Sequence, residues 1–301
     1  MYKVRENILD LFFIINFVCT KANGMMKRQV ILITGASSGI GYDTALKLAT
    51  QGHIVYGAAR RVERMEPLRE KGVIPLRMDV TDEASMAEAV QGILDAQGHI
   101  DVLVNNAGYG YLGAIENVSL EEARRQLEVN LFGLARLTQL VLPHMRERRS
   151  GRIVNVSSIA GKAVILFGGW YNVSKFAVEA FSDALRMETK PFGIRVSIIE
   201  PSGIRTPWGT IAADNLENSS TGTAYEEPAL HMASNFRWAY GSKLLSPASR
   251  VTRSIVRAVN ARRPRVRYRP GRGACTVIGL HALLPARWWD AAVRILGKKI
   301  K

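Results

Sequence analysis

The stretch from Val30 to Gly41 reads VILITGASSGIG. Its first half is apolar, as in a buried strand, and a helix-like pattern begins at Tyr42, so the glycines between them form a turn from strand to helix. Glycines at 35, 39 and 41 permit a tight turn, a close approach of the backbone and tight packing of the helix. The free N–H groups at the start of that helix attract a pyrophosphate. The spacing G-x-x-x-G-x-G departs from the more usual G-x-G-x-x-G, but the order strand, glycine turn, helix predicts a dinucleotide site.

Two further apolar strands end in small or polar residues. One leads into Asn105-Asn106-Ala107-Gly108, and the other delivers the hydroxyls of Ser157 and Ser158. Ligands of an open parallel sheet lie at the carboxyl ends of its strands, so we expect these residues to meet at one edge. Between the two strands, Asn130 interrupts an amphipathic helical stretch. It is either part of a capped or kinked helix or an amide that holds a catalytic water.

The run Tyr171-Asn172-Val173-Ser174-Lys175 places a phenol and an ammonium one helical turn apart. A neighbouring cation favours the phenolate and lowers the pKa of tyrosine, which makes the phenol a better acid-base catalyst near neutral pH. In isolation, such a pair is as well explained by a half-exposed aromatic ring beside a solvated lysine. Its position after the strands described above favours a catalytic pair.

Together these segments, over roughly residues 28–207, resemble the short-chain dehydrogenase/reductase family. The resemblance implies an α/β fold with one doubly wound parallel sheet (a Rossmann fold, strand order 3-2-1-4-5-6-7) in a single domain. It also implies four catalytic residues, which are Asn130, Ser158, Tyr171 and Lys175. Ser158 is preferred to Ser157 because the family's serine precedes its tyrosine by thirteen residues, as Ser158 precedes Tyr171.

The resemblance also implies a role for each of the four. Tyr171 would exchange a proton with the substrate oxygen while hydride passes to or from the nicotinamide, and Ser158 would hold that oxygen. Lys175 would lower the pKa of the phenol and hold the ribose hydroxyls of the cofactor, and Asn130 would position a water. The five histidines show no ligand spacing, so we expect no metal.

The cofactor preference is predicted from the end of the second strand, where Arg60 occupies the position at which an acid would hold the ribose of NAD. A guanidinium there suits the 2′-phosphate of NADP(H), to which Ser37 could add a hydroxyl; a solvated surface arginine is the alternative. After the sixth strand, Ser202 stands where the family usually has glycine. The predicted cofactor contacts are Gly35, Ser37, Ser38, Gly39, Ile40, Gly41, Arg60, Asp79, Val80, Asn105, Ala107, Gly108, Tyr171, Lys175, Pro201, Ile204 and Thr206.

The segment 207–245 lies where the family recognises its substrates. It is rich in aromatic residues and poor in charges that would neutralise an acidic substrate, which favours a bulky apolar carbonyl or alcohol. The pattern of the chain resembles the branch that contains hydroxysteroid dehydrogenases, retinol dehydrogenases and acyl-dihydroxyacetone-phosphate reductases. The alternative is a dinucleotide-binding regulator or scaffold without catalysis. The aromatic residues are Trp208, Tyr225, Phe236, Trp238 and Tyr240.

The net charge of +15 is concentrated near the C-terminus, in residues 250–301. Residues 262–270 alternate arginine with other residues and predict the last strand, whose charges discourage pairing at the sheet edge. Further on, Arg287, Asp290, Arg294 and Lys298 fall on one stripe of an amphipathic helix. We expect this basic tail, about 262–301, to contact an anionic membrane surface or a partner subunit, or to pack over the substrate entrance. Nucleic acid is the least favoured partner, because no binding motif accompanies the charge.

Residues 1–24 match nothing in the family and carry a short apolar run that Asp10 and Asn16 interrupt. We interpret them as a non-native extension or a start site placed too far upstream, with Met25 or Met26 as the true start. The remaining 25–301 form the single predicted domain, which we expect to be cytoplasmic and to assemble as a dimer or tetramer.

Overall fold

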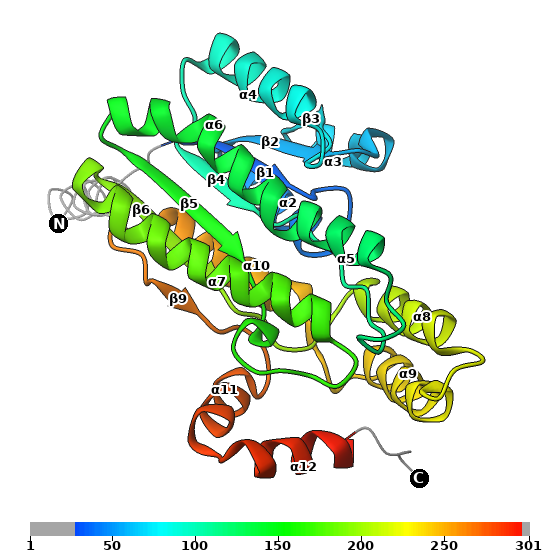
Figure 1. The fold of residues 1–301 in the computed structure, drawn as a ribbon. Coiled ribbons are helices and arrows are strands. Elements are labelled where there is room, and N and C mark those ends of the chain that lie inside the picture. Colours follow the sequence, from blue (N-terminus) through cyan, green and yellow to red (C-terminus); the bar gives the residue numbers. More distant parts are fainter. Residues whose placement is uncertain (1–27, 297–301) are drawn as a thin grey trace, which may run out of the picture.

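The computed structural model describes residues 28–296 and shows one seven-stranded parallel sheet with helices on both faces (Figure 1). Its order, β3-β2-β1-β4-β5-β6-β9, confirms the predicted doubly wound arrangement with β9 as the seventh strand. The strands are β1 (Val30–Thr34), β2 (Ile54–Ala59), β3 (Val73–Arg77), β4 (Val102–Asn105), β5 (Gly151–Val156), β6 (Ile194–Ile199) and β9 (Arg267–Tyr268).

Side chains along β1 point alternately to the two faces of the sheet, and the core accordingly has two layers. Ile31 and Ile33 pack on one face of the sheet with helices α2 and α10, whereas Val30 and Leu32 pack on the other face with α4, α6 and α7. Both faces are therefore apolar, as a parallel sheet between two helical layers requires. The longer helices of these layers are α2 (Gly39–Ala49), α4 (Glu83–Gln97), α5 (Leu120–Leu127), α6 (Gly133–Glu147), α7 (Gly169–Thr189) and α10 (Ala248–Asn260).

Short helical segments complete the layers. They are η1 (Val62–Met65), α3 (Glu66–Arg69), the π-helical turn η2 (Glu128–Phe132), η3 (Ile159–Gly161) and η4 (Lys190–Phe192). Local sequence sets the boundaries of the longer helices. Asp82 caps α4 by accepting from the N–H groups of Ala84 and Ser85, and Gly98 ends it in the left-handed conformation that glycine adopts at low cost.

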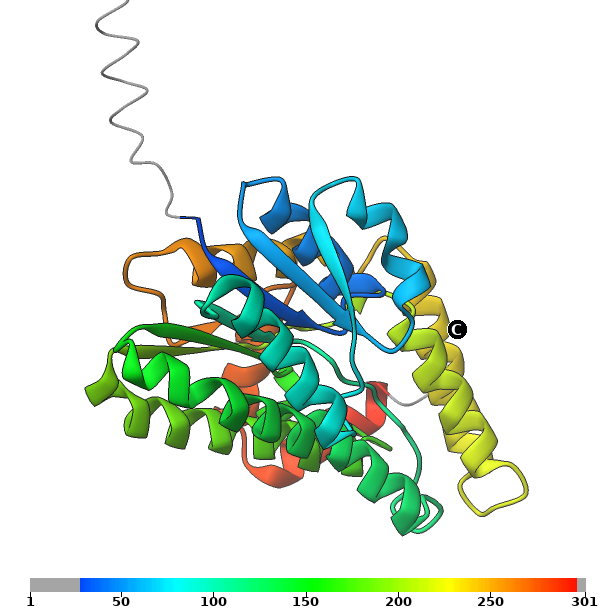
Figure 2. The same cartoon turned by 90° about the horizontal axis from the view of Figure 1, so that it is seen from above.

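The predicted substrate segment is a helical hairpin at the carboxyl ends of the strands, α8 (Trp208–Ser220) and α9 (Glu226–Gly241), which projects from the body of the molecule in Figure 2. A short second sheet, β7 (Ile204–Arg205) with β8 (Ser246–Pro247), closes the base of this hairpin. Side chains of the hairpin, among them Leu216 and Met232, pack with the ring of Tyr171 in an apolar cluster that is separate from the two core layers. The hairpin therefore forms a cap over the expected catalytic residues.

The C-terminal segment forms α11 (Ala274–Leu283) and α12 (Ala286–Leu296), which lie below the sheet in Figure 1. The predicted amphipathic helix corresponds to α12; Lys298 lies outside the described residues, as do residues 1–24 and the interpretation placed on them. No helix within 28–296 is long and apolar enough to span a membrane.

Candidate active site

The glycine turn has the geometry that the sequence predicts. Gly35 and Gly39 have φ of +68° and +57°, in the left-handed region that disfavours other residues. A Cβ on Gly41 would come 2.4 Å from the carbonyl oxygen of Gly35, so this glycine is needed for close packing. Helix α2 begins at Gly39, three residues before the predicted start, and no side chain caps its first N–H groups. These groups are free to bind a phosphate, which fits a dinucleotide.

Two residues that sequence reasoning passed over hold this turn in place. Thr34 Oγ1 accepts from the backbone N–H groups of Asn106 and Ala107 at 3.0 and 2.9 Å, and the Asn106 amide donates to Thr34 O at 2.9 Å. The ends of β1 and β4 are thereby locked side by side. The sequence signal for this contact was the pair Asn105-Asn106 at the end of the fourth strand, but a role was predicted from the sequence only for Asn105.

The side chain of Asn105 points into the molecule and not toward the glycine turn, and its contact with the cofactor stays a prediction. The residue is 3% exposed and donates to Asn155 Oδ1 at 2.9 Å and to Thr138 Oγ1 at 3.2 Å inside the molecule. Successive strand residues point to opposite faces, so only one of two adjacent asparagines can face the turn. Asn105 therefore joins β4 to β5 and α6.

The other predicted cofactor residues lie along the same edge. Arg60 immediately follows β2, is exposed, and makes no hydrogen bond or ion pair to any residue of the described chain. Thr206 lies over the glycine turn, since a Cβ on Gly39 would be 3.6 Å from its methyl group. Asp79 is half-buried and accepts from Thr81, whereas Ile204 is buried in the core. Ser202 fits in place of glycine because Gly271 lies opposite, where a Cβ would come 2.1 Å from Ser202 Oγ.

Three of the four predicted catalytic residues meet at the carboxyl end of β5. Lys175 Nζ lies 5.9 Å from the centroid of the Tyr171 ring and donates to Val156 O at 3.0 Å. Ser158 lies near the Tyr171 phenol, whose pKa its hydroxyl lowers. Ser157 faces away from this group, toward Glu179: a Cβ on Gly161 would be 2.8 Å from Ser157 Oγ and 3.0 Å from Glu179 Cγ.

Asn130, the fourth, lies in the π-helical turn η2, so the helix is locally distorted as one interpretation expected. Its amide donates to Tyr109 O at 2.9 Å and to Ser174 Oγ at 3.0 Å, and its oxygen accepts from Tyr109 N at 3.0 Å. Both amide hydrogens are taken, which leaves only oxygen lone pairs for a water. The side chain ties the loop after β4 to helix α7.

Burial controls the protonation of the central pair. It raises the pKa of Tyr171 to about 12, although the hydrogen bond with Ser158 opposes the shift. It lowers the pKa of Lys175 to about 8, opposed by the charge of Glu179. The expected lowering of the phenol pKa by Lys175 is therefore outweighed by desolvation, which disfavours the charged form of each group.

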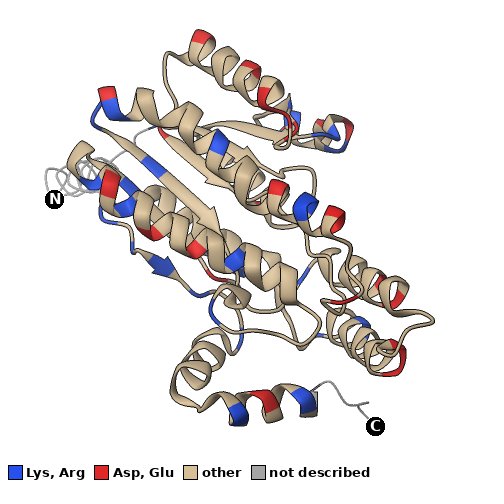
Figure 3. Cartoon of the chain, viewed as in Figure 1, with Lys and Arg blue, Asp and Glu red and all other residues tan. Residues whose placement is uncertain are grey.

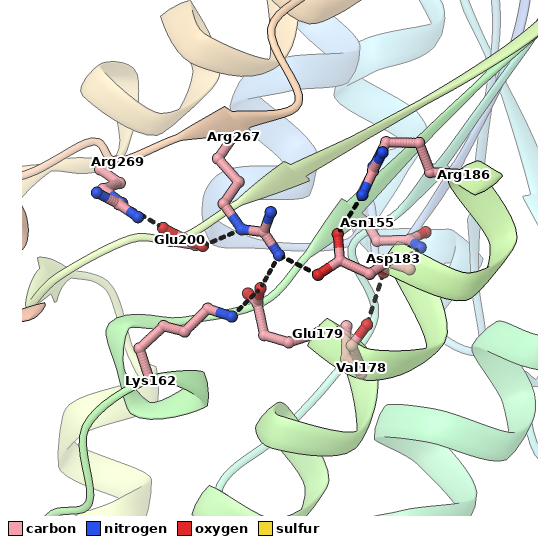
Figure 4. Close-up of polar contacts among 10 residues, drawn as sticks. Asn155, Lys162, Val178, Glu179, Asp183, Arg186, Glu200, Arg267 and Arg269 are labelled. Atoms are coloured by element: carbon pink, nitrogen blue, oxygen red, sulfur yellow. Dashed lines mark hydrogen bonds and ion pairs between the residues drawn. The ribbon is translucent and has the colours of Figure 1, made fainter. Parts of the chain in front are cut away.

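Behind Lys175, on the next turn of α7, a buried ion cluster joins α7 to the sheet edge (Figure 4). Arg267 of β9 donates to Glu200, Glu179 and Asp183 at 2.9, 3.1 and 2.6 Å. Glu200, which is completely buried, also accepts from Arg269 at 2.6 Å, and Glu179 pairs with Lys162 at 3.1 Å.

This cluster corrects the interpretation of the arginines in 262–270. The predicted edge position of the strand is right, but Arg267 and Arg269 neutralise buried carboxylates instead of standing free to discourage pairing. Because those carboxylates lie far away in the sequence, no local pattern could show the pairing.

The cap places aromatic rings directly over the tyrosine. The rings of Tyr171 and Trp208 are 5.2 Å apart, and Tyr240 stacks next to Trp208 at 6.1 Å. Only glycine fits at position 110, where a Cβ would lie 2.3 Å from the indole. Two other aromatic residues of this segment lie outside the group around Tyr171: Trp238 is 56% exposed, and Tyr225 hydrogen-bonds Glu116.

The geometry defines a dinucleotide-binding α/β oxidoreductase with a tyrosine-based site. Residues 29–216 match the family model described as short chain dehydrogenase, and the chain belongs to that family. Over 270 residues it is 37% identical to a probable short-chain type dehydrogenase/reductase of Helicobacter pylori, covering 89% of this chain and 98% of the relative. Over 182 residues it is 46% identical to a 3-ketodihydrosphingosine reductase of Bacteroides thetaiotaomicron, covering 60% of this chain and 66% of that protein.

Solved structures agree with the fold. A short-chain dehydrogenase from Streptomyces avermitilis is 32% identical, covers 89% of this chain and 98% of its own, and has a TM-score of 0.73. A metagenomic short-chain oxidoreductase in complex with NADP is 32% identical, with a TM-score of 0.57 and coverage of 59% and 84%. A Burkholderia phymatum member in complex with NAD is 26% identical, with a TM-score of 0.73 and coverage of 85% and 93%. The chain is thus an oxidoreductase of a family that uses NAD or NADP to interconvert carbonyls and alcohols.

Proposed function

We propose that the protein is an NADP(H)-dependent oxidoreductase that interconverts a bulky, apolar ketone or aldehyde with its alcohol. The observation that carries the proposal is the grouping of Tyr171, Ser158 and Lys175 at one sheet edge beneath an aromatic cap. The glycine turn reaches the same edge through Thr206. A bound nicotinamide would supply or accept the hydride there.

Each residue has a distinct task in this proposal. Tyr171, with a raised pKa, is fully protonated at neutral pH and donates its proton to the carbonyl oxygen during reduction. Ser158 hydrogen-bonds the same oxygen and orients it toward the phenol. Lys175, with a pKa near 8, is positively charged at neutral pH, which stabilises a developing phenolate and binds ribose hydroxyls. Asn130 keeps the loop after β4 against α7, so that the edge stays rigid.

The preference for NADP(H) rests on Arg60. Its guanidinium is exposed and unpaired within the described chain, directly beyond β2 and next to the glycine turn in the sheet order. A planar fork of donors suits a phosphate dianion, and no acid occupies the position that would hold a ribose hydroxyl. Use of NADP(H) also fits the proposed site of action in the cytoplasm.

The substrate class rests on the cap. The cluster around Tyr171 contains alanine, leucine, methionine and aromatic side chains, and the rings of Trp208, Tyr240 and Phe236 lie next to one another. A steroid, retinoid or long-chain lipid carbonyl has the apolar surface to replace these contacts. The 46% identity to a 3-ketodihydrosphingosine reductase over 182 residues supports a lipid-like substrate.

Two surfaces support the proposed partners. Exposed apolar side chains on η2 and α7, namely Phe132, Val173 and Phe176, suit pairing of two copies through these helices. On α11 and α12, Leu283 and Trp288 are 84% and 69% exposed and lie beside Arg287, which suits a peripheral contact with an anionic membrane. Trp289, by contrast, donates to Val164 O and packs on His281, so it anchors α12 to the body of the protein.

The alternative function is a dinucleotide-binding regulator that lacks turnover, and Tyr171→Phe separates the two. We expect this variant to keep its affinity for NADPH and to lose NADPH oxidation with a panel of steroid, retinoid and long-chain 3-keto substrates. Tyr56→Phe is the matched control, because its hydroxyl accepts only from Gln97, far from the edge, and should leave turnover unchanged. Turnover that survives in Tyr171→Phe would remove Tyr171 from the mechanism.

A further inference from the structure

A second basic site lies on the flank of α10. A hollow of about 290 Å³ opens between this helix and the loop after β9. Arg250, Arg253 and Arg257 line it from the helix together with Ser254, and Arg269 lines it from the loop, with Pro270 and Gly271 beside it. Figure 3 shows β9 and the loops on either side of it in the colour of lysine and arginine.

The charge of this hollow is uncompensated. The three helix arginines are exposed and make no side-chain hydrogen bond or ion pair within residues 28–296. Between Glu227 and Asp290 the chain contains no acidic residue at all. Arginines three and four residues apart on a helix repel one another and destabilise it. An anionic ligand would relieve this repulsion.

The fourth arginine is fixed before any ligand arrives. Arg269 donates from Nε to the completely buried Glu200 at 2.6 Å, and Glu200 also accepts from Arg267. Holding the side chain in this way reduces the entropy lost when a ligand binds.

The hollow is separate from the expected dinucleotide site. Thr252 on α10 faces α2, donating to Asp43 at 2.7 Å and meeting Thr44 at 3.3 Å. Arg250 and Ser254 are each two positions from Thr252 and therefore lie on nearly the opposite side of the helix. The glycine turn and the hollow are thus on different sides of α10.

We propose that this hollow binds a phosphate group. Three unpaired arginines beside a fourth that Glu200 fixes match the charge of a phosphate dianion, which accepts two hydrogen bonds from one arginine. A second copy of the chain would not fit by symmetric contact, because it would bring arginines against arginines. The phosphate belongs either to a free phosphorylated molecule or to the headgroup of an anionic lipid.

Calorimetric titration of the full chain with inorganic pyrophosphate tests the proposal. We expect saturable binding that weakens roughly tenfold or more in Arg253→Gln/Arg257→Gln, since each lost charge-assisted bond is worth about a factor of ten. The binding should be unchanged in protein saturated with NADPH, whose own pyrophosphate occupies the glycine turn. The matched control is Arg262→Gln/Arg263→Gln, which removes the same charge from exposed residues outside the hollow. Equal weakening in this control would show a diffuse charge effect and overturn the proposal. Loss of binding in protein saturated with NADPH would place pyrophosphate at the dinucleotide site and overturn the proposal as well.

A second titration distinguishes the two sources of phosphate. Vesicles of phosphatidylcholine with phosphatidic acid should bind the wild-type chain more strongly than the Arg253→Gln/Arg257→Gln variant if the ligand is a headgroup. If pyrophosphate binds but the wild-type chain and the variant bind vesicles equally, the ligand is a soluble phosphorylated molecule. Binding of an RNA oligonucleotide, with neither pyrophosphate nor vesicles bound, would contradict the proposal.

Discussion

Replacing Lys175 by methionine should make the protein more stable while abolishing its proposed activity. The lysine is 6% exposed, and burial lowers its pKa from 10.5 to about 8. A shift of this size corresponds to about 3 kcal/mol by which burial disfavours the charged form below pH 8. Methionine fills a similar space without charge but leaves the carbonyl of Val156 without its 3.0 Å hydrogen bond, a loss of about 1 kcal/mol.

The net gain at pH 7 is therefore about 2 kcal/mol, which raises Tm by about 5 °C in a chain of this size. The gain depends on pH in a defined direction. Between pH 8 and 10.5 the unfolded wild-type chain binds more protons at this lysine than the folded chain, so wild-type stability rises with pH and the advantage of the variant disappears.

Differential scanning calorimetry of the wild-type chain and Lys175→Met at pH 7 and pH 10 measures the gain in Tm and its dependence on pH. Groups that titrate in both proteins cancel in the difference between their Tm values. Lys162→Met is the matched control. Its ammonium is 31% exposed and pairs with the buried Glu179 at 3.1 Å, so its removal should lower Tm. A lower Tm for Lys175→Met at pH 7, or a difference that does not change with pH, would refute the account of a desolvated lysine.

Three further outcomes follow from the contacts. Arg267→Met should lower the free energy of unfolding, measured in urea, by about 3 kcal/mol, because three carboxylates lose a cation while each keeps a second partner. Arg263→Met is the control, and an equally small loss in both variants would show that the ion cluster does not stabilise the fold. Asn106→Ala should weaken NADPH binding roughly tenfold in a fluorescence titration, because it removes one of the three hydrogen bonds that hold the end of β4 to Thr34. Unchanged affinity would show that this bond is not needed for cofactor binding. Trp288→Ala should reduce sedimentation with anionic vesicles without changing Tm, and equal sedimentation would exclude α12 as the membrane contact.

The order of the sheet was predicted from the resemblance to a known family, and that resemblance rests on short, local signatures near three of the strand ends. A glycine turn, an amide pair, a serine pair and a tyrosine-lysine pair each identify one strand end or the helix beside it, and parallel topology brings them to one edge. The choice of Ser158 over Ser157 agrees with the side to which each hydroxyl points.

What could not be predicted depends on partners distant in sequence. Arg267 meets Glu179 and Glu200, 88 and 67 residues away, so its local run of arginines gave a surface interpretation. Asn105 and Asn106 are chemically identical neighbours, and only the pleat of β4 decides which one faces the turn. Likewise, the contact of the Trp208 ring with the Tyr171 ring requires the path of the α8–α9 hairpin, which a pattern of aromatic residues does not specify.

The most direct test of the central claim is a fluorescence titration of the wild-type chain with NADPH and NADH side by side, repeated with Arg60→Asp. The account predicts binding of NADPH at least roughly tenfold tighter than NADH, and loss of that preference in the variant. Equal binding of the two cofactors, or a preference for NADH in the wild-type chain, would contradict it.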